Sequence, residues 1–173
     1  MKKMMFQIGD TVIHPGYGAG TVVDIEQLQC LGSDKPYYSI ELSDAFKTRM
    51  WVPVKDAGKK GMRRPTLKSQ LGRIWRTLRA EPVTLPTDHK ERYESLQEKL
   101  RGGDIFRTAE AVRDMFWKDH RTRKLTIKGK QLYDRGLTFL ASEVAVVQGC
   151  DSAAAEAMIS DMLGASLAAR PAV

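Results

Sequence analysis

The spacing of apolar residues changes near residue 66, and this change constrains the fold more than any other feature of the chain. Before it, apolar residues alternate with polar ones, as at Tyr38, Ile40 and Leu42, which is the pattern of a strand. After it, they recur at intervals of three and four, the period of a helix, at Leu67, Leu71, Ile74, Trp75 and Leu78. The chain therefore predicts two units, one stranded and one helical.

Short strands separated by turn residues fill the first unit. Proline and two glycines in residues 14–18 favour a tight turn, and a second turn is expected at residues 32–35. The strands are expected around Phe6 and Ile8 and at residues 11–13, 20–26, 37–42 and 48–54. Five short strands with no helical period between them favour a small, closed or nearly closed barrel of the SH3 or Tudor type.

Helix signals continue to the end of the chain. Pro82 and Pro86 end the first helix and stiffen a connector, and a second helix is expected at residues 89–100. Three further helices are expected behind capping side chains at Asp104, Thr126 and Asp151. We predict an α+β chain with a small N-terminal Tudor/SH3-like β-barrel (1–64), a linker helix and connector (65–88), and a C-terminal all-α helical domain (89–173).

The chain carries a formal charge of +7, most of it in the middle. Residues 65–150 contain 17 basic and 11 acidic side chains. One short stretch sets six cations against Asp119 alone: Lys118, Arg121, Arg123, Lys124, Lys128 and Lys130. Such an excess suits a polyanionic partner such as nucleic acid. A run of charges is also typical of a solvated helix face, so charge leaves both interpretations open.

The sequence contains no constellation of catalytic residues. His14, His89 and His120 are scattered, Cys30 and Cys150 lie 120 positions apart, and no glycine-rich phosphate loop occurs. We therefore expect no enzymatic activity, no metal and no cofactor. Because the chain has neither a long apolar run nor an apolar signal core after its first residues, we expect a soluble, cytoplasmic protein.

Short motifs follow one another in a particular order from about residue 6 to residue 163. They include FQIGD at 6–10, VPV at 52–54, GDIF at 103–106, AEAVRD at 109–114 and SE at 142–143. This order resembles the CarD/CdnL family of bacterial transcription regulators, whose N-terminal module also occurs in the transcription-repair coupling factor. The resemblance implies a Tudor-like domain that binds the RNA polymerase β subunit. It also implies a helical domain that binds promoter DNA at the upstream edge of the transcription bubble.

The polymerase contacts implied by position lie at the end of one strand and on another. They are Glu26, Gln27, Leu28, Cys30, Arg49 and Trp51. Leu28 and Trp51 stand where some relatives have basic residues, so apolar burial is expected to replace charge pairing. An exposed tryptophan would anchor such an interface. The alternative is that Trp51 covers the barrel core.

The predicted DNA contacts combine the basic stretch with positions implied by the resemblance. They are His89, Lys90, Arg92, Arg123, Lys124, Lys128 and Lys130. His89 stands where relatives carry a tryptophan wedge, and imidazole has a smaller stacking area than indole. The expected function is modulation of open-complex stability by a protein localised to the nucleoid through RNA polymerase. The alternative is an adaptor that docks on polymerase and whose helical domain does not bind DNA.

Overall fold

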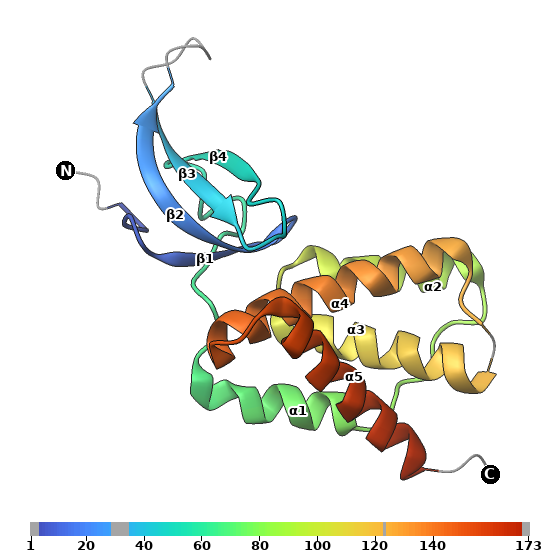
Figure 1. Ribbon diagram of the computed structural model, residues 1–173. Helices are drawn as coiled ribbons and strands as arrows, with labels where there is room; N and C mark the ends of the chain where they lie inside the picture. Colours follow the sequence, from blue (N-terminus) through green and yellow to red (C-terminus); the bar gives the residue numbers. More distant parts are fainter. Residues whose placement is uncertain (1–3, 29–34, 123, 171–173) are drawn as a thin grey trace. The chain divides into compact units, whose positions relative to one another are not determined.

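The computed structural model describes residues 4–28, 35–122 and 124–170, and the chain divides into two compact units, Met1–Pro65 and Thr66–Val173. Within the described residues, the first unit contains a four-stranded antiparallel sheet and the second contains five α-helices (Figure 1). The predicted α+β architecture, with strands first and helices second, is confirmed.

The sheet of the first unit is a meander in which each strand is antiparallel to the next. Its strands are β1 (Thr11–His14), β2 (Gly18–Gln27), β3 (Pro36–Leu42) and β4 (Arg49–Pro53). The pairing of β2 with β3 shifts register between Val22 and Asp24, and both strands curve along their length (Figure 1). Arg63 returns to β1, where its N–H and C=O pair with Ile13 at 3.1 and 2.8 Å. This pairing partly closes the sheet into a small barrel.

The strand expected around Phe6 and Ile8 does not form, so the described residues contain four strands and not five. The chain turns instead, because the Gln7 N–H donates to the Asp10 carboxylate at 2.9 Å and Gly9 has a φ of 90°. Phe6 is buried, and its N–H donates to the Tyr38 hydroxyl at 3.1 Å. The segment therefore contributes the buried Phe6 ring to the barrel core.

The second unit is built from five helices and two short helical turns. They are η2 (Lys68–Gln70), α1 (Leu71–Arg79), α2 (His89–Arg101), α3 (Ile105–Trp117), η3 (Lys118–Thr122), α4 (Ile127–Gln148) and α5 (Ser152–Ala168). In the part of the chain that the structure describes, none of these helices combines the length and apolar character needed to cross a membrane.

Helix α1 packs inside the second unit, although the sequence analysis assigned it to a linker. Its Leu71, Ile74 and Leu78 are buried in the same core cluster as Val112 of α3 and Ile159 of α5. An apolar stripe of this kind must be covered, and the neighbouring helices of the same unit cover it. The segment that connects without regular secondary structure is therefore residues 80–88, between α1 and α2.

Side-chain caps set the starts of four helices. Asp104, Thr126 and Asp151, the three predicted caps, each accept a hydrogen bond from a backbone N–H in the first turn of the helix that follows. Asp88 caps α2 in the same way. Helix α4 ends at Gly149, whose φ of 75° is the left-handed conformation that glycine adopts without strain. The predicted helix starts at these caps are confirmed.

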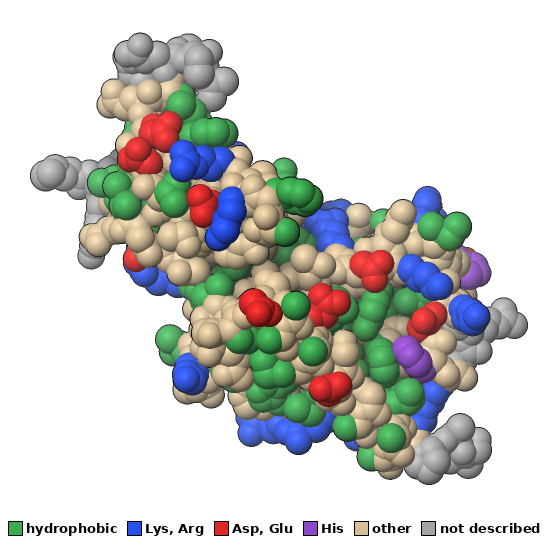
Figure 2. All heavy atoms as spheres, in the orientation of Figure 1, with side chains coloured by type: hydrophobic (Ala, Val, Ile, Leu, Met, Phe, Trp, Pro, Cys, Tyr) green, Lys and Arg blue, Asp and Glu red, His purple; other side chains and the backbone are tan. Residues whose placement is uncertain are grey.

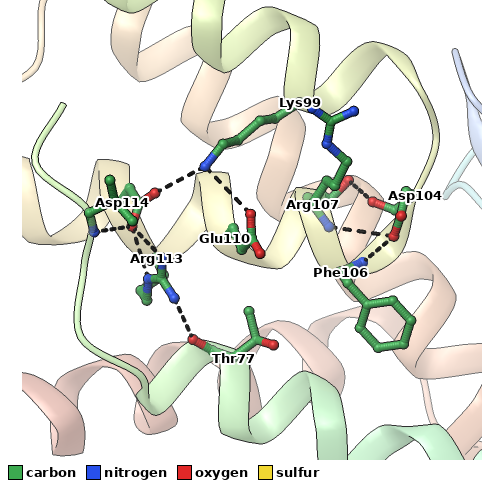
Figure 3. Close-up of polar contacts among 10 residues, drawn as sticks. Thr77, Lys99, Asp104, Phe106, Arg107, Glu110, Arg113 and Asp114 are labelled. Carbon is green, nitrogen blue, oxygen red and sulfur yellow. Dashed lines mark hydrogen bonds and ion pairs between the residues drawn. The ribbon is translucent and has the colours of Figure 1, made fainter. Parts of the chain in front are cut away.

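A buried ion pair ties the connector to α3 (Figure 3). Asp114 is only 2% exposed, and its carboxylate accepts hydrogen bonds from the Arg113 Nε at 2.9 Å and from the Val83 N–H at 3.1 Å. Arg113 also donates to the Thr77 carbonyl, near the end of α1, at 3.1 Å. Lys99 of α2 lies 3.4 Å from the other Asp114 oxygen. The Asp114 carboxylate thus joins the connector and α2 to α3, and Arg113 joins the end of α1 to the same point.

Replacing Asp114 with alanine would leave the Arg113 guanidinium buried without its carboxylate. We expect the free energy of unfolding of the helical unit to fall by about 3–5 kcal/mol. Urea unfolding of the full chain, followed by the helical circular dichroism signal, measures this change.

Glu98→Ala is the matched control, because it removes an exposed contact between Glu98 and Arg101 in the same unit. Its effect should stay within about 0.5 kcal/mol. Equal stability of the Asp114→Ala and Glu98→Ala chains would contradict the anchoring role of Asp114.

Candidate functional surfaces

Strand β4 presents Trp51 on the face opposite the barrel core. Along β4, Val52 is buried and Met50 packs against the core, whereas Arg49 and Trp51 are exposed. This alternation places the tryptophan outside, and its exposed fraction is 44%. The alternative in which Trp51 covers the barrel core is therefore wrong.

Glu26 and Trp51 come together although 25 residues separate them. The β2 and β4 strands flank β3, and Ser39 of β3 pairs with both Asp24 and Trp51. The Trp51 indole Nε1 donates to Glu26 Oε2 at 3.4 Å. This bond restrains the indole, so the exposed ring has a preferred orientation on the outer face of the sheet.

The other residues of the predicted polymerase surface lie around this pair. Gln27 is exposed at the end of β2 and Leu28 beside it is half-buried. Cys30 lies outside the described residues. Glu26, Arg49 and Trp51 lie on the outer face of the sheet, where Glu26 is half-buried and the other two are exposed. We call these three residues, together with Gln27 at the end of β2, the sheet-face surface.

An exposed aromatic residue that the sequence analysis did not single out lies between β3 and β4. Phe46 is 88% exposed. Its loop is shaped by Asp44, whose carboxylate accepts a hydrogen bond from the Thr48 N–H at 2.9 Å. Hydrogen bonds from Thr48 lower the pKa of the Asp44 carboxyl. No apolar period marks this loop, so nothing in the sequence pattern distinguishes Phe46 from a core residue.

In the second unit, α2 and α4 run side by side in the same direction. Leu96 and Leu100 of α2 share a buried cluster with Leu132 of α4. One turn further along α4, Gly136 lies so close to Leu100 that an added Cβ would come within 3.3 Å of it. Both helices therefore start at the same end of the unit, where α3 finishes (Figure 1). His89 and Ile127 are their first residues.

Exposed lysines from both helices gather at this end. Lys90 follows His89 on α2, Lys124 precedes α4, and Lys128 and Lys130 lie in its first turn, and all four are exposed. The predicted contact Arg123 lies outside the described residues. We call this group of four lysines, together with His89, the basic end. Figure 2 shows, at the right, histidine side chains among lysine, arginine and acidic side chains.

The structure gives Arg92 a different role from the expected phosphate contact. Its side chain is buried, with 8% of the residue exposed. Its Nη1 donates to the carbonyls of Pro86 and Thr87 at 2.8 and 3.0 Å, and its Nη2 lies 2.6 Å from His89 Nδ1. The guanidinium is therefore directed into the start of α2, whereas His89 is exposed.

Ile127 lies beside the basic end and was not singled out from the sequence; we include it in the basic end from here on. It is 79% exposed and is the first residue of α4, directly after the cap Thr126. Its position directly after the N-cap was the signal that could have identified it. The buried face of α4 is formed by apolar residues later in the helix, so its first residue need not point into the core. An exposed apolar side chain among lysines is suited to contact with bases or sugars in nucleic acid.

Two family models match the chain. Residues 6–66 match the "CarD-like/TRCF RID domain", and residues 73–160 match "CarD, C-terminal domain". The second match alone covers 88 of the 173 residues. The chain belongs to the CarD family. The resemblance drawn from the order of motifs is thereby confirmed, and the match to the RID domain implies an interaction with RNA polymerase.

A similar curated protein agrees with this assignment. The chain is 30% identical over 145 residues to a protein of Bacillus subtilis (strain 168) named "Putative transcription factor YdeB". The alignment covers 84% of this chain and 94% of that protein. CarD-family proteins are transcription regulators without catalytic activity, so the expected absence of enzymatic activity is confirmed.

The cap of α2 predicts a specific response to acid. Hydrogen bonds from the Glu91 and Lys90 N–H groups lower the pKa of the Asp88 carboxyl, and the charges of His89 and Arg92 contribute. Because the folded pKa is depressed, the cap stabilises α2 fully above the ordinary aspartate pKa of about 3.9. Its contribution is lost only as pH falls through the lowered folded value. The protection of the Lys90 and Glu91 amides against hydrogen exchange, relative to their intrinsic exchange rates, should therefore decrease in that range.

Asp88→Ser is the matched control, because serine caps a helix without a carboxyl group that titrates. In this variant, the acid-induced loss of protection at the Lys90 and Glu91 amides should disappear while the cap itself persists. The same loss of protection in both chains would show that another group controls the start of α2.

Proposed function

We propose that this CarD-family chain docks on the β subunit of RNA polymerase through its stranded unit and contacts promoter DNA through its helical unit. The contact lies at the upstream edge of the transcription bubble and modulates the stability of the open complex. The proposed contact with DNA rests on the basic end, where exposed lysines from two helices lie beside His89 and Ile127. The observation that carries the polymerase part is the match to the RID domain.

The sheet-face surface suits an interface with an apolar centre and a polar rim. The Trp51 indole provides the large, partly exposed ring that binding hot spots favour, and its bond to Glu26 reduces the freedom that binding would remove. Arg49 and Gln27 supply exposed polar groups around it. Burial of this ring, rather than charge pairing at position 51, is the main contribution that we propose for the polymerase contact.

Trp51→Ala should weaken retention of the chain by the polymerase β subunit. We expect a loss of about 2 kcal/mol or more, which is about 30-fold in affinity, because a hot-spot indole is removed. Binding of the full chain to immobilised polymerase measures it.

Tyr17→Ala is the matched control for Trp51→Ala. Tyr17 is 63% exposed and lies in the turn between β1 and β2, outside the sheet-face surface. Removing it should leave polymerase binding unchanged. If Trp51→Ala and Tyr17→Ala bind polymerase equally well, Trp51 does not belong to the interface.

The basic end suits phosphates more than particular base sequences. Lysine is a flexible point charge, and neutralised phosphates position a protein without specifying a sequence. His89 and Ile127 supply a planar ring and an apolar side chain for bases exposed by melting. If these contacts favour the melted promoter over the closed one, the open complex is stabilised by that difference in binding free energy.

The double variant Lys128→Ala with Lys130→Ala should weaken binding to duplex DNA and reduce its dependence on salt. Each phosphate contact contributes about 0.9 to the slope of log affinity against log salt concentration. The slope should therefore fall by up to about 1.8. Retention of the full chain on duplex DNA across a range of salt concentrations measures it.

Lys68→Ala is the control for charge alone. Lys68 lies far from the basic end. It is two residues from Thr66, whose N–H donates to Glu143 in α4. Glu143 is 13 residues from Lys130, which is about 20 Å along the helix. This variant should keep the full salt slope. Absence of DNA retention by the unaltered chain, even at low salt, would favour the alternative function of an adaptor that docks on polymerase without contacting DNA.

A further inference from the structure

The first turn of α2 is held by two charged side chains that act in opposite ways. The Asp88 carboxylate accepts hydrogen bonds from the N–H groups of Lys90 and Glu91. The Arg92 guanidinium donates to the carbonyls of Pro86 and Thr87, the last residues of the connector before the cap. Together they leave little freedom at the point where the connector becomes α2.

Arg92 also determines which hydrogen-bonding groups His89 can offer. A guanidinium carries only donors, so the 2.6 Å contact between Arg92 Nη2 and His89 Nδ1 requires Nδ1 to accept. A neutral imidazole that accepts at Nδ1 carries its proton on Nε2. While this bond is made, His89 presents a flat ring with a single N–H donor at Nε2, and the residue is exposed.

We infer that Arg92 is a positioning residue, which holds the exposed His89 ring in one orientation and one tautomer at the basic end. Arg92 itself does not contact DNA, because its guanidinium is buried and bonded within the first turn of α2. The role at DNA rests on the proposed function, in which the fixed ring meets a base that melting has exposed.

Positioning has a measurable consequence for affinity. A side chain that is already ordered loses less conformational freedom when it is bound, which corresponds to about two- to tenfold in affinity. Lys90, the next residue, is exposed and acts by charge. These two cations in the first turn of α2 therefore differ in the observable that they control: Arg92 controls the fixed ring, and Lys90 controls the response to salt.

The first test needs no DNA. Nitrogen NMR of the imidazole in the full chain, at pH 8 where an ordinary histidine is neutral, reports which ring nitrogen carries the proton. The unaltered chain should show His89 protonated on Nε2. In Arg92→Met, which keeps the length of the side chain but has no donors, the preference should decrease toward a mixture. An unchanged tautomer in Arg92→Met would overturn the inference.

The second test separates positioning from charge in binding to a DNA duplex that carries an unpaired stretch. Arg92→Lys keeps the charge but cannot make the three directed bonds of the guanidinium. We expect it to bind about two- to tenfold more weakly with an unchanged salt slope, whereas Lys90→Ala should reduce that slope by about 0.9. Circular dichroism of each variant verifies that the helices are retained.

Arg92→Lys binding as tightly as the unaltered chain, or Arg92→Met lowering the salt slope as Lys90→Ala does, would overturn the inference. Either result would mean that Arg92 acts as a phosphate contact or has no part in the surface. Failure of the unaltered chain to bind DNA would instead overturn the proposed function. In that case the tautomer measurement would still decide whether Arg92 positions the ring.

Discussion

The carboxylate of Asp114 holds the connector and α2 to α3 at a single buried point. It accepts from Arg113 on its own helix, from the backbone of Val83 in the connector, and lies beside Lys99 of α2. A buried charge without partners is strongly unfavourable, so the segments that supply those partners are held to α3. The course of the connector depends on this point, and with it the place where α2 starts and where His89 lies.

The two surfaces owe their form to different physical arrangements. On the sheet, the alternation of side chains in β4 leaves Trp51 outside, and the strand order brings Glu26 within reach of its indole. In the helical unit, parallel packing of α2 and α4 brings their starts together, so lysines that are about 40 residues apart share one end. The first surface depends on strand pairing and the second on helix packing.

Sequence reasoning succeeded where the signal is local. The caps Asp104, Thr126 and Asp151 were predicted because each precedes an apolar helical period, and a cap acts within its own first turn. It failed at Phe6, whose apolar side chain fills the barrel core without belonging to a strand. It also treated Arg92 as a surface cation, because the carbonyls that it binds belong to backbone whose course the sequence does not specify.

The sequence by itself determined the order of strands and helices, the starts of the capped helices, the excess of positive charge and membership in the CarD family. These follow from periodicity, local hydrogen bonds, composition and the order of motifs. Each of them depends either on residues close together in the sequence or on the composition of the whole chain. Only the tertiary structure decided that Trp51 is exposed, that Arg92 is buried and that Ile127 joins the basic end. Burial and direction depend on which distant segments pack together, and no local pattern carries that information.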